Sequence, residues 1–191
     1  QKAAAMHFTF RIAGDCHGAR YSNGDYAGTI TNSYASGAVT GLNGVGGLVG
    51  RNQGSIEGSY ATGQVSATQK AGGLVGLNDT TGVVSTSYVN SVATVTATDY
   101  SGGFVGVNLG GVTESSVAST VVVNGVNFVG GLVGANGSFT DATASLTDSS
   151  TAAAVNATGN QIGGVAGVNL AGITDTNASG AVTVAANAFA V

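Results

Sequence analysis

The chain contains no proline, no tryptophan and only one cysteine, Cys16. A collagen-like triple helix is excluded, because proline is absent and glycine does not occupy every third position. A single cysteine cannot form an internal disulfide, so a small disulfide-stabilised fold is excluded as well. No apolar run reaches the roughly 18 residues of a membrane-spanning helix.

Charged residues are also scarce, at 7% of 191 residues, whereas 43% are hydrophobic. Disordered chains show the opposite balance, so we expect a folded chain. The charge is unevenly divided. Residues 1–70 hold five cations and three acids, a net of +2, and residues 71–191 hold six acids and no cation, a net of −6. This division indicates either random drift in the charges of surface residues or electrostatic complementarity between the two ends of the chain. The sequence contains no basic patch interleaved with aromatic residues, so it does not predict a nucleic-acid partner.

Glycine, in contrast, is abundant, with 33 residues, and much of it lies in a seven-residue motif. The motif reads Gly-Gly, a bulky apolar residue, a small apolar residue, Gly, any residue, Asn. Its copies start 26, 30, 28 and 33 residues apart. A period in this range predicts a repeat array whose units bury their apolar faces against one another. The five copies are Gly46–Asn52, Gly72–Asn78, Gly102–Asn108, Gly130–Asn136 and Gly163–Asn169.

Aligning the repeats predicts columns of equivalent residues. One column contains Ile30, Ile56, Val84, Val112, Leu146 and Ile173. A second contains Val39, Val65, Val121, Val155 and Val182, with Ala93 in the third unit. A third contains Tyr34, Tyr60 and Tyr88 and continues as Ser116, Ser150 and Asn177.

The apolar runs are short, rich in β-branched residues and interrupted by Gly and Asn, which favours short strands separated by turns. We therefore predict an all-β fold, a parallel β-solenoid (β-helix) of about six coils with roughly three short strands per coil. Residues 26–191 form the solenoid, with an insertion loop within 137–145. Residues 1–25 fit the repeat poorly, and we expect an N-terminal cap or a subunit-connecting strand there.

Because the spacing within the motif is the same in all five copies, we predict that its glycines and asparagines lie at the corners of the coils. Gly-Gly is expected to supply permissive dihedral angles, and the Asn to adopt a left-handed conformation and to stack as an amide ladder. A row of Asn side chains that binds a ligand is the functional alternative. The corner residues are Gly46, Gly47, Asn52, Gly72, Gly73, Asn78, Gly102, Gly103, Asn108, Gly130, Gly131, Asn136, Gly163, Gly164 and Asn169.

The residues predict no catalytic, cofactor or metal site, and we expect a protein that is not an enzyme. Asp15-Cys16-His17 is no nucleophile arrangement, because catalytic Cys and His are usually remote in sequence. Zinc and calcium sites lack the spaced ligands they need. The acids Glu114, Asp148 and Asp175 share one column, and we interpret them as a solvated face.

The motif and its period resemble the GLUG repeat family, from Gly28 to about Val182. The resemblance implies a right-handed solenoid from a secreted bacterial surface protein, such as a filamentous-haemagglutinin-like adhesin, and it carries over no catalytic residue.

Three function classes follow: a structural or adhesive extracellular protein, a glycan- or ice-binding module, and an enzyme, which we disfavour. The first is either a self-assembling filament subunit or a segment of an adhesin at the bacterial cell surface. Its expected partner is a second copy, head to tail, with host or matrix glycans as further partners. The expected subunit contacts are Met6, Phe8, Phe10, Ile12, Phe189 and Val191.

Overall fold

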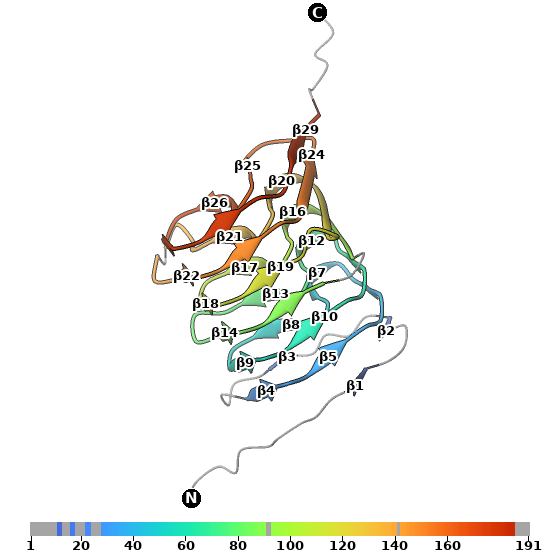
Figure 1. The fold of residues 1–191 in the computed structure, drawn as a ribbon, viewed down its shortest axis with the longest axis vertical. Helices are drawn as coiled ribbons and strands as arrows, with labels where there is room; N and C mark the ends of the chain where they lie inside the picture. Colours follow the sequence, from blue (N-terminus) through green and yellow to red (C-terminus); the bar gives the residue numbers. More distant parts are fainter. Residues whose placement is uncertain are drawn as a thin grey trace, which may run out of the picture.

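The computed structural model describes residues 28–90, 93–140 and 142–185, and the backbone of short strands at 11–12, 16–17 and 22–23. Within these residues the chain winds into a stack of coils, and every strand pairs in parallel with its equivalents in the neighbouring coils (Figure 1). The predicted all-β parallel solenoid is confirmed. Sheet A has seven strands and sheets C and D have six each, so the described residues complete between five and six turns.

The sheets run along the axis of the stack, and each is built from one strand of successive coils. Sheet A contains β1 (Arg11–Ile12), β5 (Tyr34–Ala35), β10 (Tyr60–Ala61), β15 (Tyr88–Val89), β19 (Ser116–Val117), β23 (Ser150–Thr151) and β28 (Asn177–Ala178). Sheet B contains β2 (Cys16–His17), β6 (Val39–Thr40), β11 (Val65–Ser66), β16 (Thr94–Gly102), β20 (Val122–Gly130), β24 (Ala154–Ala157) and β29 (Val182–Val184), with β7 (Asn43–Gly46), β12 (Gln69–Gly72) and β25 (Ile162–Gly163) alongside.

The other two sheets complete each coil. Sheet C contains β3 (Ser22–Asn23), β8 (Val49–Asn52), β13 (Val75–Asn78), β17 (Val105–Asn108), β21 (Val133–Asn136) and β26 (Ala166–Asn169). Sheet D contains β4 (Thr29–Thr31), β9 (Ser55–Glu57), β14 (Val83–Ser85), β18 (Gly111–Thr113), β22 (Ser145–Thr147) and β27 (Gly172–Thr174). A complete coil thus has three strands of three or more residues, in sheets B, C and D, and a two-residue strand in sheet A.

Two of the three predicted columns have the predicted register. The column that begins at Ile30 runs through sheet D to Ile173, and the column that begins at Tyr34 runs through sheet A to Asn177. The Val39 column was partly wrong. In sheet B, Val65 pairs with Val95 and not with Ala93. The next member is Val123 and not Val121.

The error in the Val39 column has a local cause. Val95 follows Tyr88 by seven residues, whereas Val65 follows Tyr60 by five. Two extra residues in this link, and two in the next coil, shift the strand relative to the repeat.

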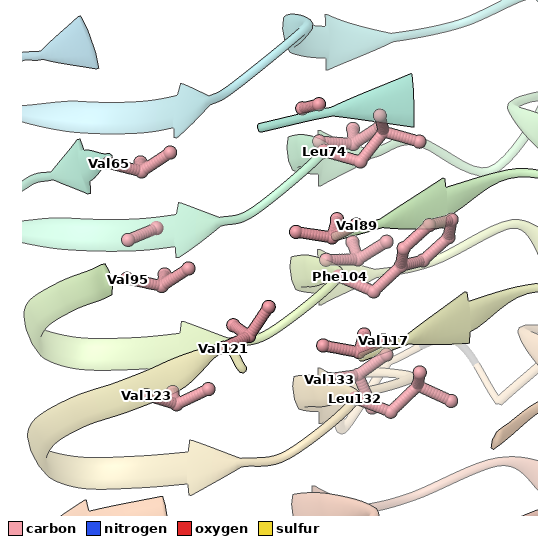
Figure 2. Close-up of a cluster of buried hydrophobic side chains, with 14 of the residues drawn as sticks. Val65, Leu74, Val89, Val95, Phe104, Val117, Val121, Val123, Leu132 and Val133 are labelled. Atoms are coloured by element: carbon pink, nitrogen blue, oxygen red, sulfur yellow. The ribbon is translucent and has the colours of Figure 1, made fainter. Parts of the chain in front are cut away.

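The core is a single apolar interior shared by all four sheets. Val65, Val95 and Val123 lie one above the other and face Leu74, Phe104 and Leu132 across the interior (Figure 2). Most of these side chains are fully buried. Each coil therefore buries its apolar residues against the coils above and below it, as expected for a repeat array.

The corners that need a left-handed backbone are not the ones expected. Neither the motif asparagines nor the Gly-Gly pairs have a positive φ in the described residues, so the predicted dihedral roles were wrong. One set of positive-φ residues lies between sheets D and A and contains Asn32, Gly58, Thr86, Glu114, Asp148 and Asp175. The other lies along sheet B, two residues before each Gly-Gly, and contains Gly44, Lys70, Tyr100, Phe128 and, just before β25, Gln161. Gly137, directly after β21, also has a positive φ.

The motif glycines are required for space. A Cβ on Gly72 would lie 1.9 Å from the Val75 carbonyl oxygen, and one on Gly73 would lie 2.1 Å from the carbonyl oxygen of Gly103 in the next coil. A Cβ on Gly106, the fifth motif position, would lie 2.7 Å from the Lys70 carbonyl carbon. Sheet C therefore packs directly on the backbone of sheet B, which only glycine permits.

Two segments depart from the regular repeat. Within residues 1–25, β1, β2 and β3 extend sheets A, B and C in the same parallel register as the later coils. The insertion predicted within 137–145 lies between β21 and β22, and its Phe139 side chain is 93% exposed.

Replacing Gly106 with alanine should destabilise the fold by about 3 kcal/mol, because the new methyl would clash with backbone atoms that cannot move aside. Gly111→Ala is the matched control, since a Cβ there meets only the Ser145 hydroxyl at 3.6 Å. We expect the control to change stability by less than about 0.5 kcal/mol. Urea unfolding of both variants measures the difference. Equal effects would contradict the packing argument.

Candidate functional site

The motif asparagines form a continuous hydrogen-bonded ladder at the end of the sheet C strands. Each amide nitrogen donates to the amide oxygen of the asparagine in the next coil. The four Nδ2–Oδ1 distances from Asn52 to Asn169 are 2.8, 2.8, 2.9 and 3.0 Å. All these bonds point toward the C-terminal coil. The ladder is therefore polar along the axis of the solenoid.

Each ladder amide makes a second bond to the backbone. Asn108 Nδ2 also donates to the Ser145 carbonyl at 3.1 Å, and Asn136 Nδ2 donates to that of Gly172 at 3.0 Å. The first four asparagines are fully buried, and only Asn169 in the last coil is exposed. Buried amides that are satisfied by one another and by the backbone cannot serve a ligand, so the arrangement supports the structural interpretation.

A second ladder, of serine hydroxyls, was not predicted. The backbone N–H of Ser33 donates to Ser59 Oγ at 3.1 Å, and the pattern repeats from Ser59 to Ser87, from Ser87 to Ser115 and from Ser115 to Ser149. Each hydroxyl donates in turn to the carbonyl two residues earlier, as Ser59 does to Glu57 at 2.9 Å. The signal was the Ser that precedes the Tyr column in every unit except the last, where Thr176 stands.

The outer surface near sheet A carries the tyrosine column and the acids. The rings of Tyr34, Tyr60 and Tyr88 stack with centroids 5.1 and 4.9 Å apart. Glu114 and Asp148 lie at the adjacent left-handed corner and are exposed, as a solvated face requires.

One ion pair lies outside sheet C. Arg51 Nε donates to Asp79 Oδ2 at 2.9 Å, and Gln53 donates to the same oxygen at 3.0 Å. Burial tends to raise the pKa of Asp79, but the bonds from Arg51, Gln53 and the Thr80 N–H outweigh it and lower that pKa. Pairs this exposed are worth about 0–1 kcal/mol, so the pair fixes local geometry more than it stabilises the fold.

The C-terminal coil leaves its interior open. Val182 continues a column in which Val65, Val95, Val123 and Val155 are at most 1% exposed, yet it is itself 44% exposed. Val184 is 50% exposed, whereas its partner Ala157 is 3% exposed. The described residues place no strand on the outer edges of β28 and β29. Of the expected subunit contacts, only Ile12 lies in a described strand, β1. Met6, Phe8, Phe10, Phe189 and Val191 lie outside the described residues.

The outer face of sheet B carries a regular array of uncharged polar side chains. Val65 and Ser66 pair with Val95 and Thr96, so the outward residues of the two coils lie side by side. We call these six residues the hydroxyl grid: Gln64, Ser66 and Thr68 in one coil, and Thr94, Thr96 and Thr98 in the next. Five of the six residues are exposed, and Thr94 is half-buried. None of the six makes a side-chain hydrogen bond in the described part of the chain.

No cluster of at least three His, Cys, Asp or Glu side chains that could hold a metal ion occurs among the described residues. None of the described residues belongs to a helix with the length and hydropathy of a membrane span.

Comparison with known protein families matches residues 41–66 to the GLUG motif. The chain carries a GLUG motif. The match runs from the link before β7 to β11, which is one turn of the solenoid and includes the first Gly-Gly corner and Asn52. In this turn the GLUG motif thus specifies the crowded corner, the ladder and the Ser59 hydroxyl. Comparisons with curated proteins and with solved structures found no match.

Replacing Asn108 with aspartate should destabilise the protein by about 3–5 kcal/mol at pH 7, because a buried carboxylate cannot donate to the Asn136 oxygen. Burial would raise the pKa of this new carboxyl above its unfolded value. The loss is then full above the folded pKa and shrinks as the pH falls toward the unfolded value. Asn169→Asp, at the exposed end of the ladder, is the control with a small expected effect. Thermal unfolding between pH 4 and pH 8 measures both, and a loss independent of pH would contradict the argument.

Two Ser→Ala changes should act in opposite directions. The Ser101 hydroxyl is buried without a hydrogen-bond partner in the described residues, so Ser101→Ala should stabilise the fold by about 1 kcal/mol. Ser87→Ala removes the acceptor of the Ser59 N–H and should destabilise it by about 1–3 kcal/mol. Urea midpoints measure both. A Ser87→Ala variant as stable as the wild type would show that the hydroxyl ladder contributes nothing.

Proposed function

We propose that this protein is a structural solenoid that acts outside the cell and grows by end-to-end contact, as a filament subunit or as a rod segment of a secreted bacterial adhesin. The observation that carries the proposal is the open interior of the last described coil. Val182 and Val184 are about half exposed, although the column of Val182 is closed in every earlier described coil and Ala157, the partner of Val184, is 3% exposed. Burying such side chains contributes about 1.5–3 kcal/mol each, so a further coil is strongly favoured there.

The opposite end of the stack offers the matching edge. Sheets A and B begin with β1 and β2, which pair on one side only within the described residues. If β1 and β2 of a second copy continue sheets A and B, they meet β28 and β29. Sheets C and D have one strand fewer than sheet A, so this junction leaves room for one further strand in each.

The direction of the strands fixes the polarity of the contact. Every pair in the solenoid is parallel, and a head-to-tail junction preserves this pairing. Head-to-tail contacts join unlike surfaces and give open filaments unless they curve closed. The net charges of +2 on residues 1–70 and −6 on residues 71–191 favour the same polarity. Charge is the smaller contribution, since exposed ion pairs are worth about 0–1 kcal/mol.

Val182→Asp should abolish assembly, because it puts a charge into the apolar column that the next coil would cover. The matched control is the neighbouring Thr183→Asp, which adds the same charge to the outward side of β29. We expect the wild type and the control to form filaments at high concentration and Val182→Asp to stay monomeric, by light scattering and electron microscopy.

Circular dichroism should show the same β-sheet signal for both variants, and 0.5 M salt should weaken assembly only modestly. A wild-type chain that stays monomeric at high concentration would contradict end-to-end growth.

A further inference from the structure

The outer face of sheet B is distinguished from the other faces of the solenoid by its breadth. Its two longest strands, β16 and β20, have nine residues each and pair at seven positions, which makes a broad, regular surface. In the three outward columns around the hydroxyl grid, no described residue is Asp, Glu, Lys or Arg. Besides the grid itself, these columns contain His17, Ala38, Thr40, Leu42, Val122, Asn124, Val126, Ala154, Asn156, Thr158, Ala181, Thr183 and Ala185.

We propose that this face binds an extended, neutral polysaccharide, with the hydroxyl grid at the centre of the site. The free groups of the grid are the first reason. Buried hydroxyls such as Ser59 donate and accept within the fold, whereas the grid hydroxyls and the Gln64 amide face outward without a partner in the described residues. They present donors and acceptors together, which is what sugar hydroxyls recognise.

The spacing of the grid is the second reason. Successive coils repeat about every 4.8 Å, and alternate residues along a strand lie about 6.6 Å apart. A pyranose unit in an extended β-linked chain is about as long as one coil is thick. A glycan that runs along the solenoid axis would therefore present each sugar to an equivalent row of side chains, first Ser66 and then Thr96.

Charge distinguishes the partner further. The face repels neither sign and pairs with neither, so it matches an uncharged ligand. Within sheet B, the described charged residues are Lys70 in β12 and Asp99 in β16, which lie beyond the grid along their strands and outside the three columns. Other described charges lie on other faces, such as Arg51 and Asp79 outside sheet C and Glu114 and Asp148 beside sheet A. Binding to this face should therefore be insensitive to salt.

Because the face is rigid, the binding free energies of many weak contacts along it can add. Thr and Ser have short side chains that lose little conformational entropy when they are fixed, and the strands beneath them are held on both sides. No Phe, Tyr or Trp lies in the described part of these columns, so each sugar is bound weakly. Affinity then depends on many contacts along one rigid chain, which an insoluble polysaccharide provides.

The test is a pull-down of freshly centrifuged, monomeric protein on microcrystalline cellulose and on chitin. We expect the wild type to bind at least one of them, equally in 0.05 M and 0.5 M NaCl. Thr96→Glu, at the centre of the grid, should reduce the bound fraction at least fivefold. The matched control is Thr113→Glu on sheet D, whose column already holds Glu57, and it should bind within twofold of the wild type.

Unchanged melting temperatures would show that both variants are folded. Absence of binding to both polysaccharides overturns the proposal, and so does an equal loss in the two variants. Thermal hysteresis in the absence of polysaccharide binding would identify an ice-binding face and would also overturn it. Because the assay uses monomeric protein, its outcome does not depend on end-to-end assembly.

Discussion

Every feature of this protein depends on the parallel, in-register stacking of one coil on the next. The spacing of about 4.8 Å between paired strands fixes the distance between equivalent residues in all four sheets. At that distance an asparagine amide meets the next one, a serine hydroxyl meets the N–H of the neighbouring coil, and tyrosine rings stack at 4.9–5.1 Å. Glycine is needed wherever the backbone of sheet C approaches that of sheet B. Each copy of the motif supplies the glycines and the asparagine that one turn needs to meet these constraints.

The polar ladders solve a problem that an apolar interior alone leaves open. A stack of valine columns opposes a slip of two residues only weakly, because such a slip keeps the same face of the strand toward the interior and one buried valine can replace another. An asparagine or serine that slips loses its partners and leaves buried polar groups unsatisfied, at about 1–3 kcal/mol each. The ladders therefore hold the register, and the apolar columns supply most of the stabilisation.

The same distinction explains how much the sequence predicts. The solenoid fold, the Ile30 and Tyr34 columns and the row of asparagines follow from residues that recur at fixed spacing. The Val39 column failed because Val121 and Val123 are both valines and both fully buried, so apolarity could not decide between them. The hydroxyl ladder was missed because serine is common in surface turns and its burial depends on the coils above and below. The hydroxyl grid was not evident, since its two rows lie 30 residues apart.

The link between sheets C and D varies most in length. The segment from the motif asparagine to the sheet D column is four residues at Asn52, six at Asn78 and ten at Asn136, yet the register on either side is unchanged. The stacking of the coils is therefore independent of the length of the chain inserted at this corner. A guest peptide grafted there would be displayed on one side of a rigid rod, at heights set by the choice of coil. The fold can therefore space attached groups along a line at multiples of the distance between coils.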